Sequence, residues 1–369
     1  MKLFIILILF ICILLNFLYY KNERFYQNIN NIYMLSETKN FEKYTYIYNN
    51  IKEDKHINFI ELNFTSILKF LEKNINNKIK ILIYNISTST KDSEKLYKII
   101  KWLKNNNPKF IVISLIPTDW WFQLNKLNGR YSDLILFYRL NVKNFMFICG
   151  NKPEFVEKVL NTKILYKKNI LYFNINHCYD NSFVEFNKNP KNIILSNGAG
   201  GITYYYRDYI KKFKGVKRIT RFTDKNNIKT SYSKKISNYI CNFVTTRDVL
   251  NLGKYPLLKN RKINVEKKHL ISLQEPLMKH FECIASGSLL LCPLMEKPYL
   301  EKIGLIEDKN CMFVDMSNDK KIQEKIDFII DPKNRKFIDK VRKAGQEHGR
   351  KNLNSKKKYQ EFKKILSNL

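Results

Sequence analysis

The sequence predicts an α/β protein with two domains, each built on a parallel sheet, behind one N-terminal membrane-spanning helix. Short apolar runs alternate with stretches of helical period, a pattern typical of parallel strands connected by helices. A polar stretch of weak periodicity, residues 179–191, separates two such series and is the expected linker. Residues 3–18 are almost entirely apolar, and the 369 residues are enough for two domains of ordinary size.

The first element is the apolar run LFIILILFICILLNFL at residues 3–18. It is short for a bilayer span, which takes about 20 residues, but Tyr19 and Tyr20 follow as interfacial anchors. A cleaved signal peptide is the alternative, and the missing small-residue cleavage site favours an uncleaved anchor. We therefore expect a single-pass membrane protein, with the side of the membrane undetermined because basic residues flank both ends of the span.

The first strand–helix series follows a stem, residues 21–55, that is polar and rich in Tyr and Asn. Amphipathic helices are expected after Asp92 or Ser93 and from Pro153, where proline suits a first helical turn. Strands are expected at residues 78–87, 110–115, 145–149 and 169–177.

The second series begins at Asn192. Asp319 is expected to cap a helix that carries Ile322, Ile326 and Ile329 at helical spacing. The other expected elements are a strand from Asn192, a helix or loop and a strand within 228–246, a strand at 269–273, and a long basic helix from about 335 to 368.

These elements define the expected domains. Two Rossmann-like domains face each other across a cleft, and ligands of such sheets bind at the carboxyl ends of the strands. The expected boundaries are a transmembrane signal-anchor at 1–20, a stem at 21–60, a first Rossmann-like domain at 61–182, a second at 190–352, and a basic C-terminal helix at 353–369.

The formal net charge is +33, which raises the question of an anionic partner. Lys, Asn and Ile are abundant throughout, so a general compositional bias accounts for much of this charge. No zinc-finger spacing or aromatic RNA-binding signature accompanies it, and we expect no nucleic-acid partner. The seven cysteines include no CxxC and sit mostly in apolar runs, which indicates buried thiols, although one bridge stays open.

The most informative stretch is QEPLMKHFECIASGSLLLCP, residues 274–293. Pro276 suits a helix start, and Gly287 suits its end. Lys279 and Glu282 share one face of this short helix, which leads into a buried strand at residues 289–291. The pattern places an ammonium and a carboxylate beside the sheet.

This stretch resembles the donor-binding segment of GT-B glycosyltransferases of the "glycosyl transferases group 1" type, which includes spore-coat-protein-like members. Residues 299–331 resemble the family's next strand and helix, and residues 340–352 its closing helix. Residues 192–214 resemble the first strand and loop of the same domain, where Tyr204 and Arg207 fit a Tyr-x-x-Arg pattern. The resemblance covers roughly residues 190–352.

The resemblance implies the donor-binding residues. Glu282 would accept hydrogen bonds from the ribose hydroxyls of the nucleotide, because a carboxylate can take both. Lys279 and Arg207 would meet the diphosphate. Many relatives contact the donor sugar through a glutamate eight residues earlier, where this chain has Gln274 with Glu275 beside it.

Two further sets of residues are candidates. Gly198 and Gly200 follow a strand, where glycines let backbone N–H groups approach a phosphate; a tight turn is the alternative. Asp119 and His177 follow strands of the first domain, where inverting relatives hold the base that activates the acceptor; a structural role is the alternative. No Asp-x-Asp occurs, and the resemblance implies no metal and no cofactor besides the nucleotide-sugar substrate.

We therefore expect a membrane-anchored, metal-independent glycosyltransferase that moves a hexosyl or related sugar from a nucleotide-sugar to a glycan, lipid or protein. No GxSxG, HExxH or Walker motif supports a hydrolase, a zinc protease or a P-loop enzyme. A non-catalytic nucleotide- or sugar-binding protein of the same fold and a basic nucleic-acid-binding protein remain alternatives.

Overall fold

The structure is a computed structural model that describes about half of the chain. Described are residues 31–35, 50–51, 53–55, 57–62, 66–73, 80–84, 98–99, 101–102, 105–106, 111–116, 145–149, 170–172, 182–197, 205–219, 232–245, 248–250, 270–272 and 278–367. The chain divides into two compact units: residues 1–116, 131–148 and 359–369 form the first, and residues 117–130 and 149–358 form the second.

The first sheet has six strands in the order β2-β1-β3-β4-β5-β6. The pairs β1–β2, β1–β3 and β3–β4 are parallel, and Tyr33 of β1 lies in register with Ile60 of β2 and Ile81 of β3. The strands are β1 (Asn31–Leu35), β2 (Asn58–Leu62), β3 (Lys80–Tyr84), β4 (Ile111–Ile116), β5 (Phe145–Cys149) and β6 (Ile170–Tyr172).

The sheet of the second unit has five strands in the order β13-β12-β9-β7-β8, and all four neighbouring pairs are parallel. A separate antiparallel pair joins β10 (Asp248–Leu250) to β11 (Leu270–Ser272). The five strands are β7 (Lys191–Asn197), β8 (Val216–Ile219), β9 (Tyr239–Phe243), β12 (Leu289–Pro293) and β13 (Met312–Val314).

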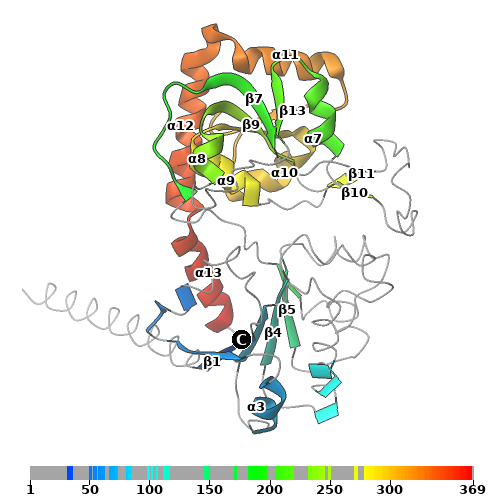
Figure 1. Ribbon diagram of the computed structural model, residues 1–369, viewed down its shortest axis with the longest axis vertical. Helices are drawn as coiled ribbons and strands as arrows, with labels where there is room; N and C mark the ends of the chain where they lie inside the picture. The colour runs from blue at the N-terminus through cyan, green and yellow to red at the C-terminus, as the bar shows by residue number, and fades with distance from the viewer. Residues whose placement is uncertain are drawn as a thin grey trace, which may run out of the picture. The chain divides into compact units, whose positions relative to one another are not determined.

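Helices cover both faces of this five-stranded sheet (Figure 1). The helices of the described chain are α3 (Ile67–Lys73), α7 (Tyr205–Tyr209), α8 (Tyr232–Ile236), α9 (Met278–Ser286), α10 (Lys297–Leu300), α11 (Asp319–Ile330), α12 (Arg335–Asn352) and α13 (Ser355–Ser367). Short 3-10 turns are η6 (Ile210–Lys212), η8 (Leu294–Glu296), η9 (Glu301–Ile303) and η10 (Pro332–Asn334).

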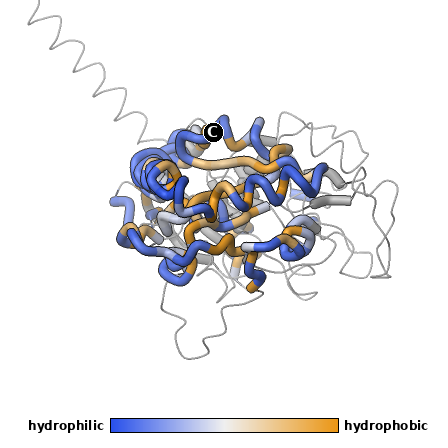
Figure 2. The backbone as a smooth tube through the Cα atoms, turned by 90° about the horizontal axis from the view of Figure 1, so that it is seen from above, coloured by the Kyte–Doolittle hydropathy of each residue, from blue (hydrophilic) through white to orange (hydrophobic). Residues whose placement is uncertain are grey.

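The position of strand β12 explains why residues 289–293 form one continuous apolar run in the sequence. Leu289 and Leu291 pack in a core cluster with residues of α7 and α11, whereas Leu290 and Cys292 pack in a second cluster with residues of α8 and α9. A strand covered on both faces needs apolar side chains at every position. In Figure 2, where each residue is coloured by its hydropathy, mainly hydrophobic strand segments lie between mainly hydrophilic helices.

Helix α9 confirms the prediction made from residues 274–293. Phe281, Ile284 and Ala285 are fully buried on its apolar face. The helix ends at Ser286, and Gly287 follows with a left-handed φ of 71°, which glycine adopts without strain. The side chain of Gln346 from α12 donates to the Ala285 carbonyl over 2.9 Å and so fastens this helix end.

Three sequence-based expectations are corrected. Strand β1 lies within the range 21–60 that was expected to be a stem, and β2 begins within it; β1 is short and lies in an Asn-rich segment, so its apolar residues form no clear pattern. Asn318, not Asp319, caps α11, since its side chain accepts from the backbone N–H groups of Lys320 and Lys321. The expected helix from 335 to 368 is two helices, because the helical bonding stops after Asn352.

Helix α13 belongs to the first unit from Tyr359 onward. There Asp54 accepts from the Tyr359 hydroxyl over 2.8 Å and forms an ion pair with Lys363 over 2.6 Å. The side chains of Lys363 and Asp54 are both more than nine-tenths buried. A buried, paired charge of this kind is strongly destabilising to break, so the end of the chain is an integral part of the first unit.

Among the described helices, none is both long and apolar enough to cross a bilayer. The expected anchor, residues 1–20, lies outside the described residues.

Substitution of Gly287 tests the end of α9. A Cβ atom at this position would lie 3.0 Å from Phe186 Cδ2 and 3.1 Å from Gln346 Nε2. Gly287→Ala also places a side chain at positive φ, which costs about 1–2 kcal/mol, so the urea midpoint of the second unit should fall. Lys351→Ala, on the exposed face of α12, should leave the midpoint unchanged. Equal midpoints for both variants would contradict this account.

Candidate functional site

The topology of the second unit brings distant segments to one edge of its sheet. From β7 the chain moves to β8 on one side and to β9, β12 and β13 on the other, so the strand order reverses between β7 and β9. In open α/β sheets, ligands bind outside the carboxyl ends of the strands at such a switch point. Helices α8 and α9 lead into parallel strands, so their first turns lie at the same edge.

Arg207 lies at this switch point. It belongs to α7, which follows β7, and it is only 1% exposed. Its guanidinium Nη2 donates to the Thr245 carbonyl just beyond β9 over 2.9 Å, while its own carbonyl accepts from Ser196 Oγ of β7 over 2.9 Å. Arg207 therefore ties the two strands together across the point where the order reverses.

Lys279 reaches the same place from the first turn of α9. Its Nζ donates to the Tyr232 hydroxyl over 3.1 Å and lies 4.6 Å from the centre of the Tyr232 ring. Burial lowers the pKa of Lys279 to about 8; Arg207 and Arg218 lower it further, whereas Glu282 opposes the shift. Lys279 is therefore a cation at neutral pH that titrates just above it.

Glu282 stands one helical turn after Lys279 and is mostly buried. Burial raises the pKa of this carboxyl, and the charge of Lys279 partly offsets the rise. Within the described part of the chain, the Glu282 side chain makes no hydrogen bond or ion pair. A carboxylate that no described residue engages, one helical turn from a lysine ammonium, is suited to bind hydroxyl groups of an anionic ligand.

Arg218 is the third cation of this site. It is the third residue of the short strand β8, and its side chain is 11% exposed. The guanidinium donates to Asp208 over 3.3 Å and to the carbonyls of Ser196 and Ile219 over 3.3 and 3.1 Å. Its Nη2 is buried and has no hydrogen-bond partner in the structure. A buried hydrogen-bond donor without an acceptor destabilises a fold by about 1–3 kcal/mol. An anion bound at this edge of the sheet would supply the acceptor.

We call Arg207, Arg218, Tyr232, Lys279 and Glu282 the donor cluster. Burial, with Glu282 adding to it, raises the pKa of Tyr232 well above its usual value, so its hydroxyl stays neutral. The charges of Arg207, Arg218 and Glu282 act on both Lys279 and Tyr232. Cations thus outnumber carboxylates around the phenol.

The structure brings together three of the residues selected from the sequence: Arg207, Lys279 and Glu282. The others fall outside the described residues: Gly198, Gly200, Gln274, Glu275, Asp119 and His177. The sequence analysis missed Arg218 and Tyr232. The one local signal for Arg218 was a basic residue inside the short strand-like run VKRI, and Tyr232 carried no signal at all.

No family model matches the sequence, and no curated protein matches it. Solved structures do match. An alpha-glucosyltransferase in complex with UDP and a 13-mer DNA containing a central A:G mismatch is 12% identical, with 92% of this chain and 99% of that chain covered and a TM-score of 0.55. The enzyme with UDP alone is 10% identical over 92% and 99%, with a TM-score of 0.52. Its complex with UDP and DNA containing an HMU base is 11% identical over the same shares, with a TM-score of 0.55.

At these identities the likeness shows the fold. The chain has a parallel α/β fold like that of the matched alpha-glucosyltransferase, and the sequence predicted an α/β fold of this kind. The matched enzyme binds UDP, and in two of the three structures it also binds DNA. Two of these matched structures contain DNA, so we withdraw the expectation that a protein of this fold has no nucleic-acid partner.

The lowered pKa of Lys279 can be measured without a ligand. Acylation by an amine-reactive ester, followed by peptide mass spectrometry, should rise through half of its maximum near pH 8 for Lys279. Glu282→Gln should move this midpoint to lower pH, because the carboxylate favours the ammonium form. The matched control Glu324→Gln, on exposed α11, should not move it. A midpoint near 10.5 would show that Lys279 is not desolvated.

Proposed function

We propose that this chain is a glycosyltransferase that takes a sugar from a nucleotide-sugar donor held by its second unit. The observation that carries the proposal is the donor cluster at the β7/β9 switch point. There the charges of two arginines and of the Glu282 carboxylate all act on Lys279, and no described residue engages that carboxylate. A fold shared with a UDP-binding alpha-glucosyltransferase adds support.

Each described residue has a chemical task in this proposal. Glu282 accepts from the ribose hydroxyls, while Lys279 and Arg207 face the diphosphate. Arg218 supplies a third cation, and its Nη2, which has no hydrogen-bond partner among the described residues, can donate to a phosphate oxygen. An arginine presents a planar fork to phosphate oxygens, whereas a lysine acts as a point charge. The arginines would therefore orient the diphosphate, and the lysine would help to neutralise its charge.

The same charges serve the reaction. As the bond from sugar to diphosphate breaks, negative charge grows on the departing nucleoside diphosphate. Fixed cations in a poorly hydrated site stabilise that charge more than water does. We infer that side chains carry out this neutralisation without a metal ion, and that no further cofactor is needed.

Other parts of the proposal rest on sequence alone. Gly198 and Gly200 would offer backbone N–H groups to the phosphates, Gln274 and Glu275 would contact the donor sugar, and Asp119 or His177 would serve as the acceptor base. The closer resemblance to spore-coat-protein-like members is also a proposal. So are the transfer of a hexosyl or related sugar and a single-pass anchor at residues 1–20.

The acceptor is proposed as a glycan, a lipid or a protein. A nucleic acid is a second candidate acceptor, favoured by the net charge of +33 and by the DNA held by proteins of the same fold. Phosphate neutralisation by Lys and Arg makes such binding fall steeply with salt, which separates it from binding of a neutral acceptor.

Removal of the Glu282 charge tests the nucleoside site. Hydrogen bonds to a charged group contribute about 1.5–3 kcal/mol, so Glu282→Gln should weaken UDP binding about tenfold or more in titration calorimetry. The change should matter less for 2′-deoxy-UDP, which lacks one hydroxyl. Glu324→Gln is the matched control and should bind UDP like the unaltered protein. Unchanged UDP affinity in Glu282→Gln would remove Glu282 from the site.

A donor panel tests the function itself. The full chain, purified in detergent, is incubated with UDP- and GDP-sugars and with glycan, lipid, protein or DNA acceptors, and both transfer and donor hydrolysis are measured. Arg207→Met should lower the rate sharply because the departing charge loses a partner. Nucleotide binding without turnover would favour the non-catalytic alternative, and DNA binding without nucleotide binding would favour the nucleic-acid-binding one.

A further inference from the structure

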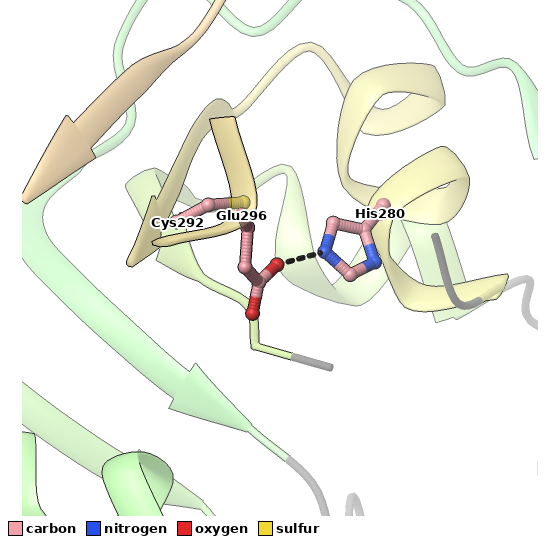
Figure 3. A group of neighbouring side chains, drawn as sticks. All are labelled: His280, Cys292 and Glu296. Atoms are coloured by element: carbon pink, nitrogen blue, oxygen red, sulfur yellow. Dashed lines mark hydrogen bonds and ion pairs between the residues drawn. The ribbon is translucent and has the colours of Figure 1, made fainter. Parts of the chain in front are cut away.

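A buried polar network lies next to the donor cluster. Thr245 Oγ1 donates to Glu296 Oε1 over 3.0 Å, and His280 Nε2 lies 3.1 Å from Glu296 Oε2 (Figure 3 shows the His280–Glu296 pair). Which of these two atoms carries the shared proton depends on the tautomer of the His280 ring. All three residues are 1% exposed or less. We call Thr245, His280 and Glu296 the buried network.

These polar groups lie in apolar surroundings. They adjoin an apolar core cluster that contains Phe281, Cys292 and Phe313. A buried carboxylate is costly even when it is paired, and apolar residues of similar volume often serve stability as well or better. The network therefore points to a role other than packing.

A metal cage is the first alternative, because Cys292 adjoins His280 and Glu296 and the possible ligand atoms lie within 4.8 Å of one another (Figure 3). One observation weighs against it: both oxygens of Glu296 already have hydrogen-bond partners, Thr245 and His280.

The network is instead connected to α7 and α9, which carry two of the three cations of the donor cluster. The Thr245 carbonyl accepts from Arg207 Nη2 over 2.9 Å, so Thr245 binds Glu296 through its side chain and Arg207 through its backbone. At the other end, His280 directly follows Lys279 in the first turn of α9. Glu296 thereby connects the end of β9 to the start of α9.

We propose that Thr245, Glu296 and His280 are positioning residues that hold Arg207 and Lys279 at the spacing a diphosphate requires. This inference rests on the proposed function of the donor cluster. The network acts on the part of the ligand that the two cations meet, and leaves the contact of Glu282 with the nucleoside unaffected. Supporting groups of this kind fix the rotamers of the residues that touch the ligand.

The test removes one hydroxyl. Thr245→Val keeps the shape and the backbone carbonyl but cannot donate to Glu296, whereas the matched control Thr245→Ser keeps the hydroxyl. Titration calorimetry of the full chain with UDP and with uridine separates diphosphate binding from nucleoside binding. Thr245→Val should lose about tenfold in UDP affinity, a size common for residues that orient a ligand-binding group, and little in uridine affinity. Thr245→Ser should match the unaltered protein.

A second measurement identifies the route. In an Arg207→Lys background, Thr245→Val should reduce UDP affinity much less than it does in the unaltered protein, because the group it positions is gone. Melting temperatures show that each variant is folded during the titration. If Thr245→Val does not fold, Glu296→Gln, which keeps the side-chain shape, takes its place with the same expected selectivity.

Three results would overturn the network inference alone, because UDP still binds in each. Equal losses for UDP and uridine, or full additivity with Arg207→Lys, would show that the network only supports the fold. Normal UDP affinity in both Thr245→Val and Glu296→Gln would show that it positions nothing. If the unaltered protein bound uridine but not UDP, the diphosphate role of the donor cluster would itself fail, and the network inference with it.

Discussion

The hydrogen bond from Arg207 to the Thr245 carbonyl is the contact on which the arrangement of the second unit depends. It spans the place where strand order reverses, and both partners are about 1% exposed. A guanidinium so deep in a fold is costly unless its N–H groups are met. The Arg207 guanidinium donates to the Thr245 carbonyl just beyond β9, and the backbone carbonyl of Arg207 accepts from the Ser196 hydroxyl of β7. Arg207 is therefore bound through both its side chain and its backbone.

Chain direction explains why so much chemistry gathers at one edge. The first turns of α8 and α9 carry Tyr232 and Lys279, and the strand ends of β8 and β9 carry Arg218 and Thr245. In a parallel sheet all of these positions fall on the same side. The cost is desolvation first and repulsion among the cations second: burial lowers the pKa of Lys279, and Arg207 and Arg218 add smaller contributions. A nearby carboxylate and a neutral phenol moderate that repulsion without cancelling it.

Much of the fold and part of the site could be predicted from the sequence. Helix α9, its glycine end and strand β12 follow from local period, and this placed Lys279 and Glu282 on one helix correctly. Arg218, Tyr232, Thr245 and Glu296 could not be found that way, because they meet through topology and not through spacing along the chain. Strand β1 was missed for a different reason. It has five residues and follows an Asn-rich segment, and a run this short shows no clear alternation of apolar and polar side chains that would distinguish a strand from a loop.

The return of the chain end to the first unit constrains how the protein forms. Residues 359–369 belong to that unit, and its buried Asp54 has partners from this last segment. During synthesis, the ribosome makes the whole second unit before it releases those partners. The first unit therefore cannot be completed before the second unit has been synthesised, although most of its residues emerge first. Until then the Asp54 carboxylate stays hydrated, and a nascent chain stalled before residue 359 holds an unfinished first unit.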